Sequence, residues 1–274
     1  MELPDPIVVL KGTLPPIAAA LLLVGALGSR LHGLALAVGV FVAFWLLKAQ
    51  PAWPHELWAQ PDGRQWLVWA LVAAGVLATL EGFRVLRGRV AAVVAALLAA
   101  GAVFFVLQKL ALRWSNADVF LHVGGGGLLA VLATLAGRRS MANAPATTLP
   151  AVVWSALLSA DAVLLTVARS GLLAQLCGAC AAAVGAAAGT ALWRRPVALG
   201  PADGGCLALA HVLFVGVGTH LADLPKPAAL AAAVAPFGLL LLQPTAAKRP
   251  AWWGLGAGLW LGVPMAVAFG LALG

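Results

Sequence analysis

The sequence predicts an all-α, polytopic transmembrane helical bundle of about ten helices, in a single integral membrane domain over residues 1–274. Of the 274 residues, 63% are hydrophobic and 9% are charged, which is too little charge to cover the surface of a soluble domain. The apolar residues form runs of about 20 residues, the length that a helix needs to cross a bilayer. Basic residues fall in pairs and clusters between these runs, where the ends of membrane helices are expected.

Breaks in the apolar runs, mostly at proline, glycine and charged residues, set the boundaries of the predicted helices. In chain order the helices are predicted over 14–29, 31–48, 65–83, 89–108, 118–137, 150–168, 171–193, 204–222, 227–244 and 251–273. Only Ser29-Arg30 separates the first two helices, and only Arg169-Ser170 separates the sixth and seventh. Each of these two pairs is therefore predicted to form a tight antiparallel hairpin.

The longest predicted loop, residues 49–64, carries three prolines together with Trp53 and Trp58. We expect it to lie on the membrane surface as a short amphipathic cap, with these tryptophans as interfacial anchors. Tryptophans near other helix ends are expected in the same two belts. They are Trp66 and Trp114 on the side of this loop, and Trp154, Trp193, Trp252 and Trp253 on the opposite side.

The distribution of basic residues predicts the orientation of the chain in a bacterial inner membrane. Loops after odd-numbered helices hold Arg30, Arg84, Arg87, Arg89, Arg138, Arg139, Arg194, Arg195, Lys248 and Arg249. The other side holds Lys11, Lys48, Arg64, Lys109, Arg113, Arg169 and Lys226, together with the acids Glu2, Asp5, Glu56, Asp62, Asp118 and Asp223. Because the first set is larger, both termini are predicted to lie outside the cytoplasm.

Two features of the charge pattern exclude other classes of protein. Residues 1–6 contain two acids and no basic residue, so a cleavable signal peptide is not expected. The net charge of +8 is explained by basic residues that face lipid headgroups, and no nucleic-acid partner is expected. The lipid bilayer is the predicted partner of nearly the whole surface.

The two halves of the chain, residues 1–140 and 145–274, begin alike. Thr13-Leu14-Pro15-Pro16 opens the first helix and Thr148-Leu149-Pro150 the sixth, while Pro61-Asp62-Gly63 precedes the third and Pro201-Ala202-Asp203-Gly204 the eighth. Counted from these Asp-Gly pairs, Gly75 aligns with Gly216. Five helices in each half would give two inverted repeats, the architecture of many secondary transporters. The alternative is chance similarity, since chains rich in Ala, Leu, Val and Gly align with themselves easily.

The size and five-plus-five layout resemble the drug/metabolite transporter superfamily in architecture. That family keeps both termini in the cytoplasm, which disagrees with the charge distribution here. The stretch from Arg169 to Leu176 and the segment Pro51-Ala52-Trp53-Pro54 are similar to uncharacterised multi-pass membrane proteins of high-GC bacteria. Neither resemblance assigns a functional residue.

Asp161 lies near the middle of the sixth predicted helix, and His211 lies at comparable depth in the eighth. A carboxylate at this depth is expected to face the bundle interior, to pair with another group or to bind a proton. Together the two side chains could form an intramembrane proton or substrate site. The alternative for Asp161 is a packing role, with the carboxyl group hydrogen-bonded to a serine or a backbone carbonyl, and a lone helical histidine is more often a satisfied core residue.

A second polar set lies near the outer helix ends. Asp118 and His122 are four residues apart on the fifth predicted helix, and His220 and Asp223 are three apart at the end of the eighth. Each spacing places the two side chains on one helix face. Two histidines and two carboxylates could bind a divalent metal if the fifth and eighth helices touch, but polar residues at helix ends are usually only solvated.

Three further motifs concern packing. Cys177 and Cys180 have redox-motif spacing, but their apolar setting favours buried packing, in line with Gly185 and Gly189 further along the helix. The four glycines 124–127 indicate either close helix contact or a broken helix that lines a cavity. Inside the ninth and tenth predicted helices, prolines predict kinks. These are Pro236 and Pro264.

These observations lead to two hypotheses of function. The first is a small-solute transporter, proton-coupled through Asp161, and it depends on the repeat, the midplane acid and the glycine run. The second is a non-catalytic membrane subunit or assembly factor of a larger envelope complex, which would equally need no soluble domain. An enzyme is not expected because no recognised catalytic arrangement joins Asp161, His211 and the outer histidines, and no cofactor or bound metal is predicted.

Overall fold

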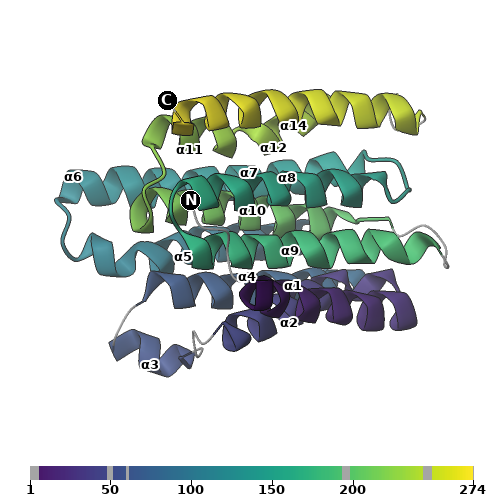
Figure 1. Cartoon of the computed structure of the whole chain (residues 1–274), viewed down its shortest axis with the longest axis horizontal. Helices are drawn as coiled ribbons and strands as arrows, with labels where there is room; N and C mark the ends of the chain where they lie inside the picture. The colour runs from purple at the N-terminus through teal and green to yellow at the C-terminus, as the bar shows by residue number, and fades with distance from the viewer. Residues whose placement is uncertain (1–5, 48–51, 60–61, 193–197, 243–248, 274) are drawn as a thin grey trace.

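The structure, a computed structural model, describes residues 6–47, 52–59, 62–192, 198–242 and 249–273, and within these ranges every regular element is a helix. Figure 1 shows long helices lying side by side along one direction, with the short helix α3 (Pro54–Ala59) at one end. In the described part of the chain, nine helices are long and apolar enough to cross a membrane. The predicted class, an all-α polytopic bundle, is confirmed.

The first half of the chain supplies five long helical segments and a surface cap. In order they are α1 (Pro6–Ala20) continued by the π-helix η1 (Leu21–Leu27), η2 (Ser29–Leu31) with α2 (His32–Leu46), the cap α3 (Pro54–Ala59), α4 (Gly63–Gly82), α5 (Gly88–Ala111), and α6 (Asn116–Val119) continued by the π-helix η3 (Phe120–Gly125) and α7 (Gly126–Ala142). Asp62 begins α4 as an N-cap, because its carboxylate accepts a hydrogen bond from the Arg64 N–H at 2.9 Å.

The second half supplies four long helices and one broken helix. In order they are α8 (Leu149–Val167), α9 (Gly171–Gly189) with η4 (Thr190–Leu192), α10 (Pro201–Leu221), α11 (Lys226–Ala233), α12 (Ala235–Gly238) with η5 (Leu239–Leu241), and α14 (Pro250–Leu273). In Figure 1, α11 and α12 lie along α14, with which both make contact. The predicted hairpins are both present: η2 joins α1 to α2, and α8 packs along α9.

Prolines account for two of the differences from the predicted helix bounds; in addition, α7 runs to Ala142, five residues past the predicted end at 137. The first helix begins at Pro6 and not at residue 14, because Pro15 and Pro16 lie inside it. Membrane helices tolerate such prolines when local π-helical adjustment and neighbouring helices satisfy the backbone, and η1 follows directly. The ninth predicted helix, 227–244, is broken after Ala233, just before Pro236, whose ring and missing N–H interrupt it. The resulting segment, Lys226–Leu241, is shorter than a regular span. By contrast, α14 runs uninterrupted past Pro264.

Helix α10 is the centre of the bundle. In its most apolar stretch 78% of the residues are buried, against 22% in α14 at the edge. It packs closely along α7 at Gly137 and Gly204, where a Cβ added to either glycine would lie within 2.4 Å of the backbone oxygen of the other. A similar contact joins α2 to α4 at Gly33 and Gly75. Small residues therefore let these helices approach until their backbones touch.

An ion pair that the sequence did not reveal joins α4 to α7 beside this contact. The Arg138 guanidinium donates two hydrogen bonds to the Glu81 carboxylate, at 2.6 and 2.7 Å, and both side chains are largely buried. Gly205 of α10 leaves room for Arg138, since a Cβ there would lie 2.6 Å from Cγ of the arginine. A bidentate pair of this kind holds the two helices in a specific relative geometry and also adds interaction energy between them.

The predicted cap loop contains a short helix, α3, and several tryptophans predicted for the interfacial belts are buried among helices. Trp53, directly before α3, and Trp58, on α3, are both exposed. Trp66, Trp154 and Trp253 lie near the starts of α4, α8 and α14, but they are buried among neighbouring helices, so they do not face outward as belt residues would. A helix end packed against neighbouring helices offers an indole an apolar site away from the lipid. The last tryptophan of that prediction, at position 193, lies outside the described residues.

The contacts of the two predicted halves differ. In the first half α2 packs along α4, whereas their counterparts in the second half, α9 and α10, make little contact. Gly75 is pressed against Gly33, while an added Cβ at its aligned partner Gly216 would meet nothing within 4 Å. The aligned glycines therefore have different packing roles, and the division into halves 1–140 and 145–274 stays a prediction.

Replacing Gly137 by alanine is expected to destabilise the fold by about 1–3 kcal/mol, the usual cost of overpacking a filled core. The added methyl group would lie 2.3 Å from the backbone oxygen of Gly204, so α7 and α10 must separate. The melting temperature of the purified protein in detergent measures the effect. The matched control is Gly262→Ala on α14, where a Cβ meets nothing within 4 Å. Equal melting temperatures for the two variants would contradict the close α7–α10 contact.

Candidate functional site

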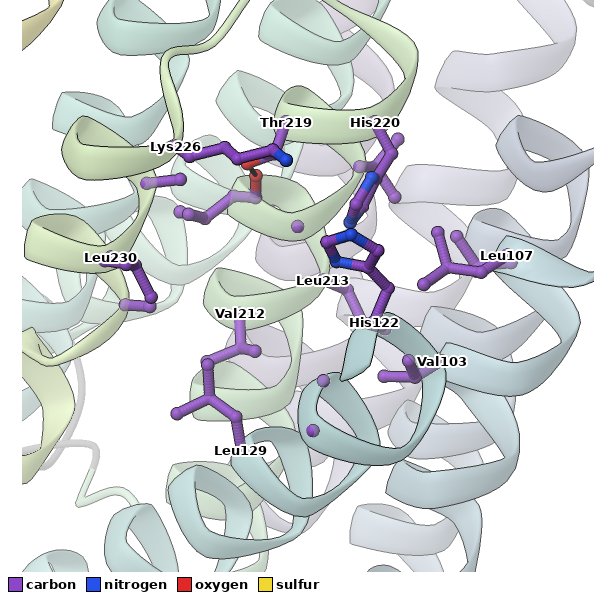
Figure 2. A pocket seen from close by; sticks show the side chains of 18 of the residues that line it. Val103, Leu107, His122, Leu129, Val212, Leu213, Thr219, His220, Lys226 and Leu230 are labelled. Atoms are coloured by element: carbon purple, nitrogen blue, oxygen red, sulfur yellow. Dashed lines mark hydrogen bonds between the residues drawn. The ribbon is translucent and has the colours of Figure 1, made fainter. Parts of the chain in front are cut away.

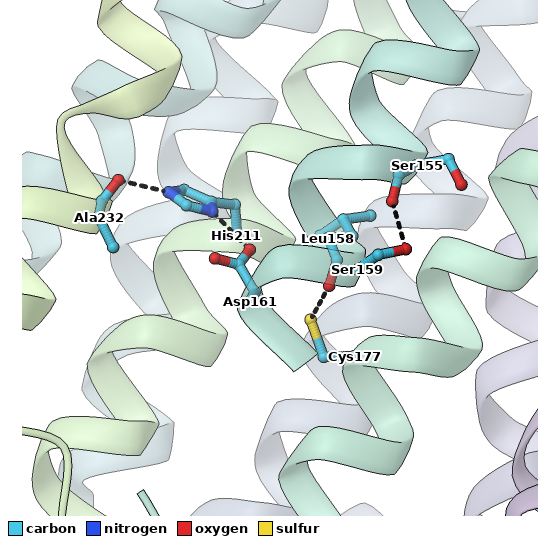
Figure 3. A network of polar contacts seen from close by, with 7 residues as sticks. All are labelled: Ser155, Leu158, Ser159, Asp161, Cys177, His211 and Ala232. Carbon is cyan, nitrogen blue, oxygen red and sulfur yellow. Dashed lines mark hydrogen bonds and ion pairs between the residues drawn. The ribbon is translucent and has the colours of Figure 1, made fainter. Parts of the chain in front are cut away.

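Asp161 and His211, the two midplane candidates, are in direct contact in the centre of the bundle. Nδ1 of His211 lies 2.6 Å from Oδ2 of Asp161, and both residues are buried, at 0% and 1% exposure. Nε2 of the same ring lies 2.9 Å from the backbone oxygen of Ala232. Figure 3 shows the imidazole between the carboxylate of α8 and the carbonyl of α11. One histidine on α10 thus links three helices.

The surroundings of this pair are closely packed. Oδ1 of Asp161 is buried and has no hydrogen-bond partner among the described residues. The Cys177 thiol donates to the backbone oxygen of Leu158 at 3.3 Å, as Figure 3 also shows. Cys177 and Cys180 are both buried and free, so packing, the favoured interpretation of this motif, agrees with their positions. Further along α9, a Cβ added at Gly185 would lie 2.8 Å from the Ser155 hydroxyl of α8.

A cavity of about 440 Å³ lies between α5, η3 with α7, α10 and α11. Most of its lining is aliphatic or glycine: Val103, Val106, Leu107, Leu121, Gly125, Gly126, Leu129, Val212, Leu213, Val215, Gly216, Val217, Ala229, Leu230 and Ala233. Its remaining lining residues are His122, Thr219, His220 and Lys226. The volume falls within the range of about 300–1,000 Å³ that is typical of small-molecule sites.

The polar lining residues gather at one end of the cavity. Figure 2 shows Thr219, His220 and Lys226 together, with Val212 and Leu129 at the opposite end. The ring centroids of His122 and His220 are 4.9 Å apart, and each ring also packs against Trp114, at 5.0 and 5.3 Å. The cavity therefore has an apolar body and a polar end at the level where α10 stops and α11 starts.

The glycine run forms part of the cavity wall. Residues 120–125 are π-helical, and Gly126 begins the regular helix α7. Gly125 and Gly126 line the cavity, and a Cβ on Gly125 would meet nothing within 4 Å. Of the two alternatives left by the sequence, an irregular helix beside a cavity describes Gly125 better than close packing. Single π-helical turns inside α-helices occur frequently at functional sites.

The outer-face candidates come together only in part. α7 packs along α10, which brings His122 and His220 into contact. Asp118 instead accepts a hydrogen bond from the Ser115 hydroxyl at 2.7 Å, and the backbone N–H of Asp223 donates to the Ala168 oxygen. In the part of the chain that the structure describes, no group of three or more potential metal ligands is present. The predicted assembly of two histidines with two carboxylates is therefore not formed.

Sequence reasoning missed Lys226 and Gly216 as members of a site. The sequence indicates only an outer-side charge at Lys226, yet this residue lines the polar end of the cavity and has no carboxylate within 4.0 Å among the described residues. The only sequence signal was its position a few residues after His220. Gly216 lies on the wall of α10, where the missing side chain leaves space.

The buried pair and the cavity are neighbours that share two helices. Asp161 and His211 are not among the residues that line the cavity, but Val212 and Ala233, which follow His211 and Ala232 in the chain, are. The hydrogen bond from His211 to Ala232 joins α10 to α11, which form two of the walls. The pair is thus placed to hold the cavity walls together.

Replacing Asp161 by leucine is expected to destabilise the protein by about 1–3 kcal/mol, since the buried His211 ring loses one hydrogen-bond partner. Asp161→Asn keeps a hydrogen-bonding group at the same position, able to donate or accept, and is expected to lose less. The melting temperatures of both variants in detergent measure the difference. A leucine variant that melts at or above the asparagine variant would contradict a stabilising role for the pair.

No protein-family model matches this chain, and neither a curated protein nor a solved structure matches it. The similarity to drug/metabolite transporters therefore stays a prediction from the sequence. The geometry of the cavity and of the buried pair carries the functional conclusion.

Proposed function

We propose that this multi-pass membrane protein is a transporter of a small solute, and that the cavity between α5, α7, α10 and α11 is its solute site. The cavity is the single observation that carries the proposal. It combines a volume of about 440 Å³ with walls that are almost entirely aliphatic and a few polar groups at one end. Binding sites for small molecules typically have this combination of apolar walls and few polar groups.

Two structural features support movement of the cavity walls. The wall on η3 is π-helical and glycine-rich, so few side chains hold it against α5. The wall on α11 is part of the broken helix, which ends at Ala233 and restarts at Ala235. Discontinuous helices beside a midplane site are a recurrent feature of secondary transporters, in which one group of helices moves against another as access alternates.

Asp161 has a different part in this proposal from the one that the sequence predicted. Its carboxylate is bonded to His211 behind the cavity wall and does not line the cavity. We therefore assign the pair a positioning role toward α10 and α11, and proton coupling through Asp161 stays a prediction from the sequence.

A second function, a non-transporting membrane subunit or assembly factor, is favoured by the burial of that same pair. A midplane acid that is hydrogen-bonded inside a packed core is sufficiently explained by structure. α14 also presents an apolar ridge with Trp252, Leu255 and Leu259 each more than 60% exposed, which either lipid or a partner helix could cover. Stoichiometric membrane proteins that accompany the protein into nanodiscs would support this function.

The proposal places the protein in a bacterial inner membrane with both termini outside the cytoplasm. The end of the bundle opposite α3 carries Arg84, Arg87, Arg138 and Arg139, as expected for a cytoplasmic face. The polar end of the cavity then faces outward, because α10 ends and α11 begins at the α3 end.

Proteoliposomes test the transport function. The wild-type protein and the Gly216→Leu variant are incubated with a small-molecule extract of the cells that express them, and the luminal contents are identified by mass spectrometry. We expect at least one compound to accumulate with the wild type and to be reduced by about tenfold or more with the variant, because the leucine fills space in the cavity.

Gly262→Leu is the matched control, since its Cβ also meets nothing within 4 Å but lies on α14, away from the cavity. This variant is expected to behave as the wild type. Accumulation of no compound above protein-free liposomes would contradict the transporter proposal, and so would equal accumulation with wild type and Gly216→Leu.

A further inference from the structure

The charge of the cavity lining has one sign. Lys226 is the only lining residue with a fixed charge, and no acidic residue lines the cavity. Lys226 is exposed at the polar end, and in the described ranges it forms no ion pair. An ammonium group beside apolar walls attracts an anion, and a ligand cation there would be repelled.

The histidines add hydrogen-bonding capacity beside this charge. The rings of His122 and His220 are held edge to face at 4.9 Å by their mutual contact and by Trp114. Within the described residues neither ring forms a hydrogen bond with the protein, so each neutral imidazole has an N–H to donate. The Thr219 hydroxyl instead donates to the Val215 backbone oxygen at 3.0 Å. Lys226 and the two histidines are therefore the donors at this end.

The body of the cavity excludes a purely polar anion. Below the donors, the lining from Val103, Leu129 and Val212 offers no hydrogen-bonding side chain. A polar group placed there would lose its hydrogen bonds to water without a replacement, which is unfavourable. The occupant that matches both ends therefore has an apolar chain and one anionic head.

The opening of the cavity indicates where such a molecule enters. Leu121 on η3 and Leu230 on α11 both line the cavity, and they are 63% and 64% exposed. The cavity thus reaches the outer surface of the bundle at two leucines, in helices that are apolar enough to contact lipid. An amphiphile that is dissolved in the bilayer could enter the cavity there, since its chain is already immersed in lipid hydrocarbon.

We propose that the solute of this cavity is an anionic amphiphile, whose apolar chain lies along Leu129, Val212 and Leu230 and whose carboxylate or phosphate head meets Lys226, His122 and His220. The inference deepens the proposed function and rests on it for transport, while binding can be tested independently. The volume that Gly125 and Gly216 leave open is the space for the chain.

Photolabelling of the full-length protein in phosphatidylcholine nanodiscs tests the inference. A dodecanoate with a diazirine on its chain is cross-linked, and the labelled peptides are mapped by mass spectrometry. We expect labels on α7 and α10 around Leu129 and Val212. Unlabelled dodecanoate or dodecyl phosphate should compete, and the tighter of the two identifies the head group. Dodecanol should compete more weakly, and dodecyltrimethylammonium should not compete.

Two variants separate the head from the chain. Lys226→Gln is expected to weaken dodecanoate binding by about tenfold or more, since it removes a charge-assisted contact, and to leave dodecanol binding unchanged. Gly216→Leu should weaken both, and Gly262→Leu neither. Because Lys226 is exposed, Lys226→Gln should melt at the wild-type temperature.

Several outcomes would overturn the inference. These are equal competition by the anionic, neutral and cationic probes, labels spread over the lipid-facing helices, or unchanged dodecanoate binding in Lys226→Gln. Failure of this inference can be distinguished from failure of the proposed function. Dodecanoate binding without any transported compound would support the anionic site and contradict the transporter. Transport of a neutral or cationic solute that Gly216→Leu blocks would support the transporter and contradict the anionic site.

Discussion

Backbone contact between α7 and α10 is the constraint from which the rest of the bundle follows. Gly137 and Gly204 meet with no side chain between them, and the Arg138–Glu81 ion pair adds α4 to the same layer. The two helices run antiparallel, so their other ends meet as His122 against His220. The glycine contact at one end and the edge-to-face rings at the other fix the register, and the cavity occupies the stretch between them.

The same central helix carries the polar group that orders the second half of the chain. His211 binds Asp161 of α8 on one side and the Ala232 carbonyl of α11 on the other. α11 is short and interrupted, so it has little intrinsic helical stability and depends on such tertiary contacts for its position. A hydrogen bond from a fully buried ring therefore supports a cavity wall that a broken helix could not hold alone.

Apolar periodicity was sufficient to locate most helices because a membrane span must satisfy its own backbone, which leaves helix length and composition as strong signals. It failed where proline had to be interpreted. Pro16 lies inside a helix because Gly39 of α2 makes room for it, with an added Cβ falling 2.6 Å from the proline Cα, whereas Pro236 interrupts one. The same residue type thus gives opposite outcomes, which depend on a neighbour distant in sequence.

The candidate site, like the helices, could be predicted from the sequence only in part. Asp161 and His211 could be paired from their depth alone, and the glycine run could be associated with an irregular helix. The role of Lys226 could not be predicted, because a lysine after a span is ordinarily a headgroup anchor and only the packing of α11 on α10 places it at a cavity.

By itself the sequence determined the membrane class and the number of long helices within one, because hydrocarbon imposes these through composition and span length. Only the tertiary structure decided which helices touch, since apolar faces in lipid are chemically alike and partner choice depends on shape at small residues such as Gly137 and Gly204. That shape, not any motif, leaves the cavity open and brings His122, His220 and Lys226 to its polar end.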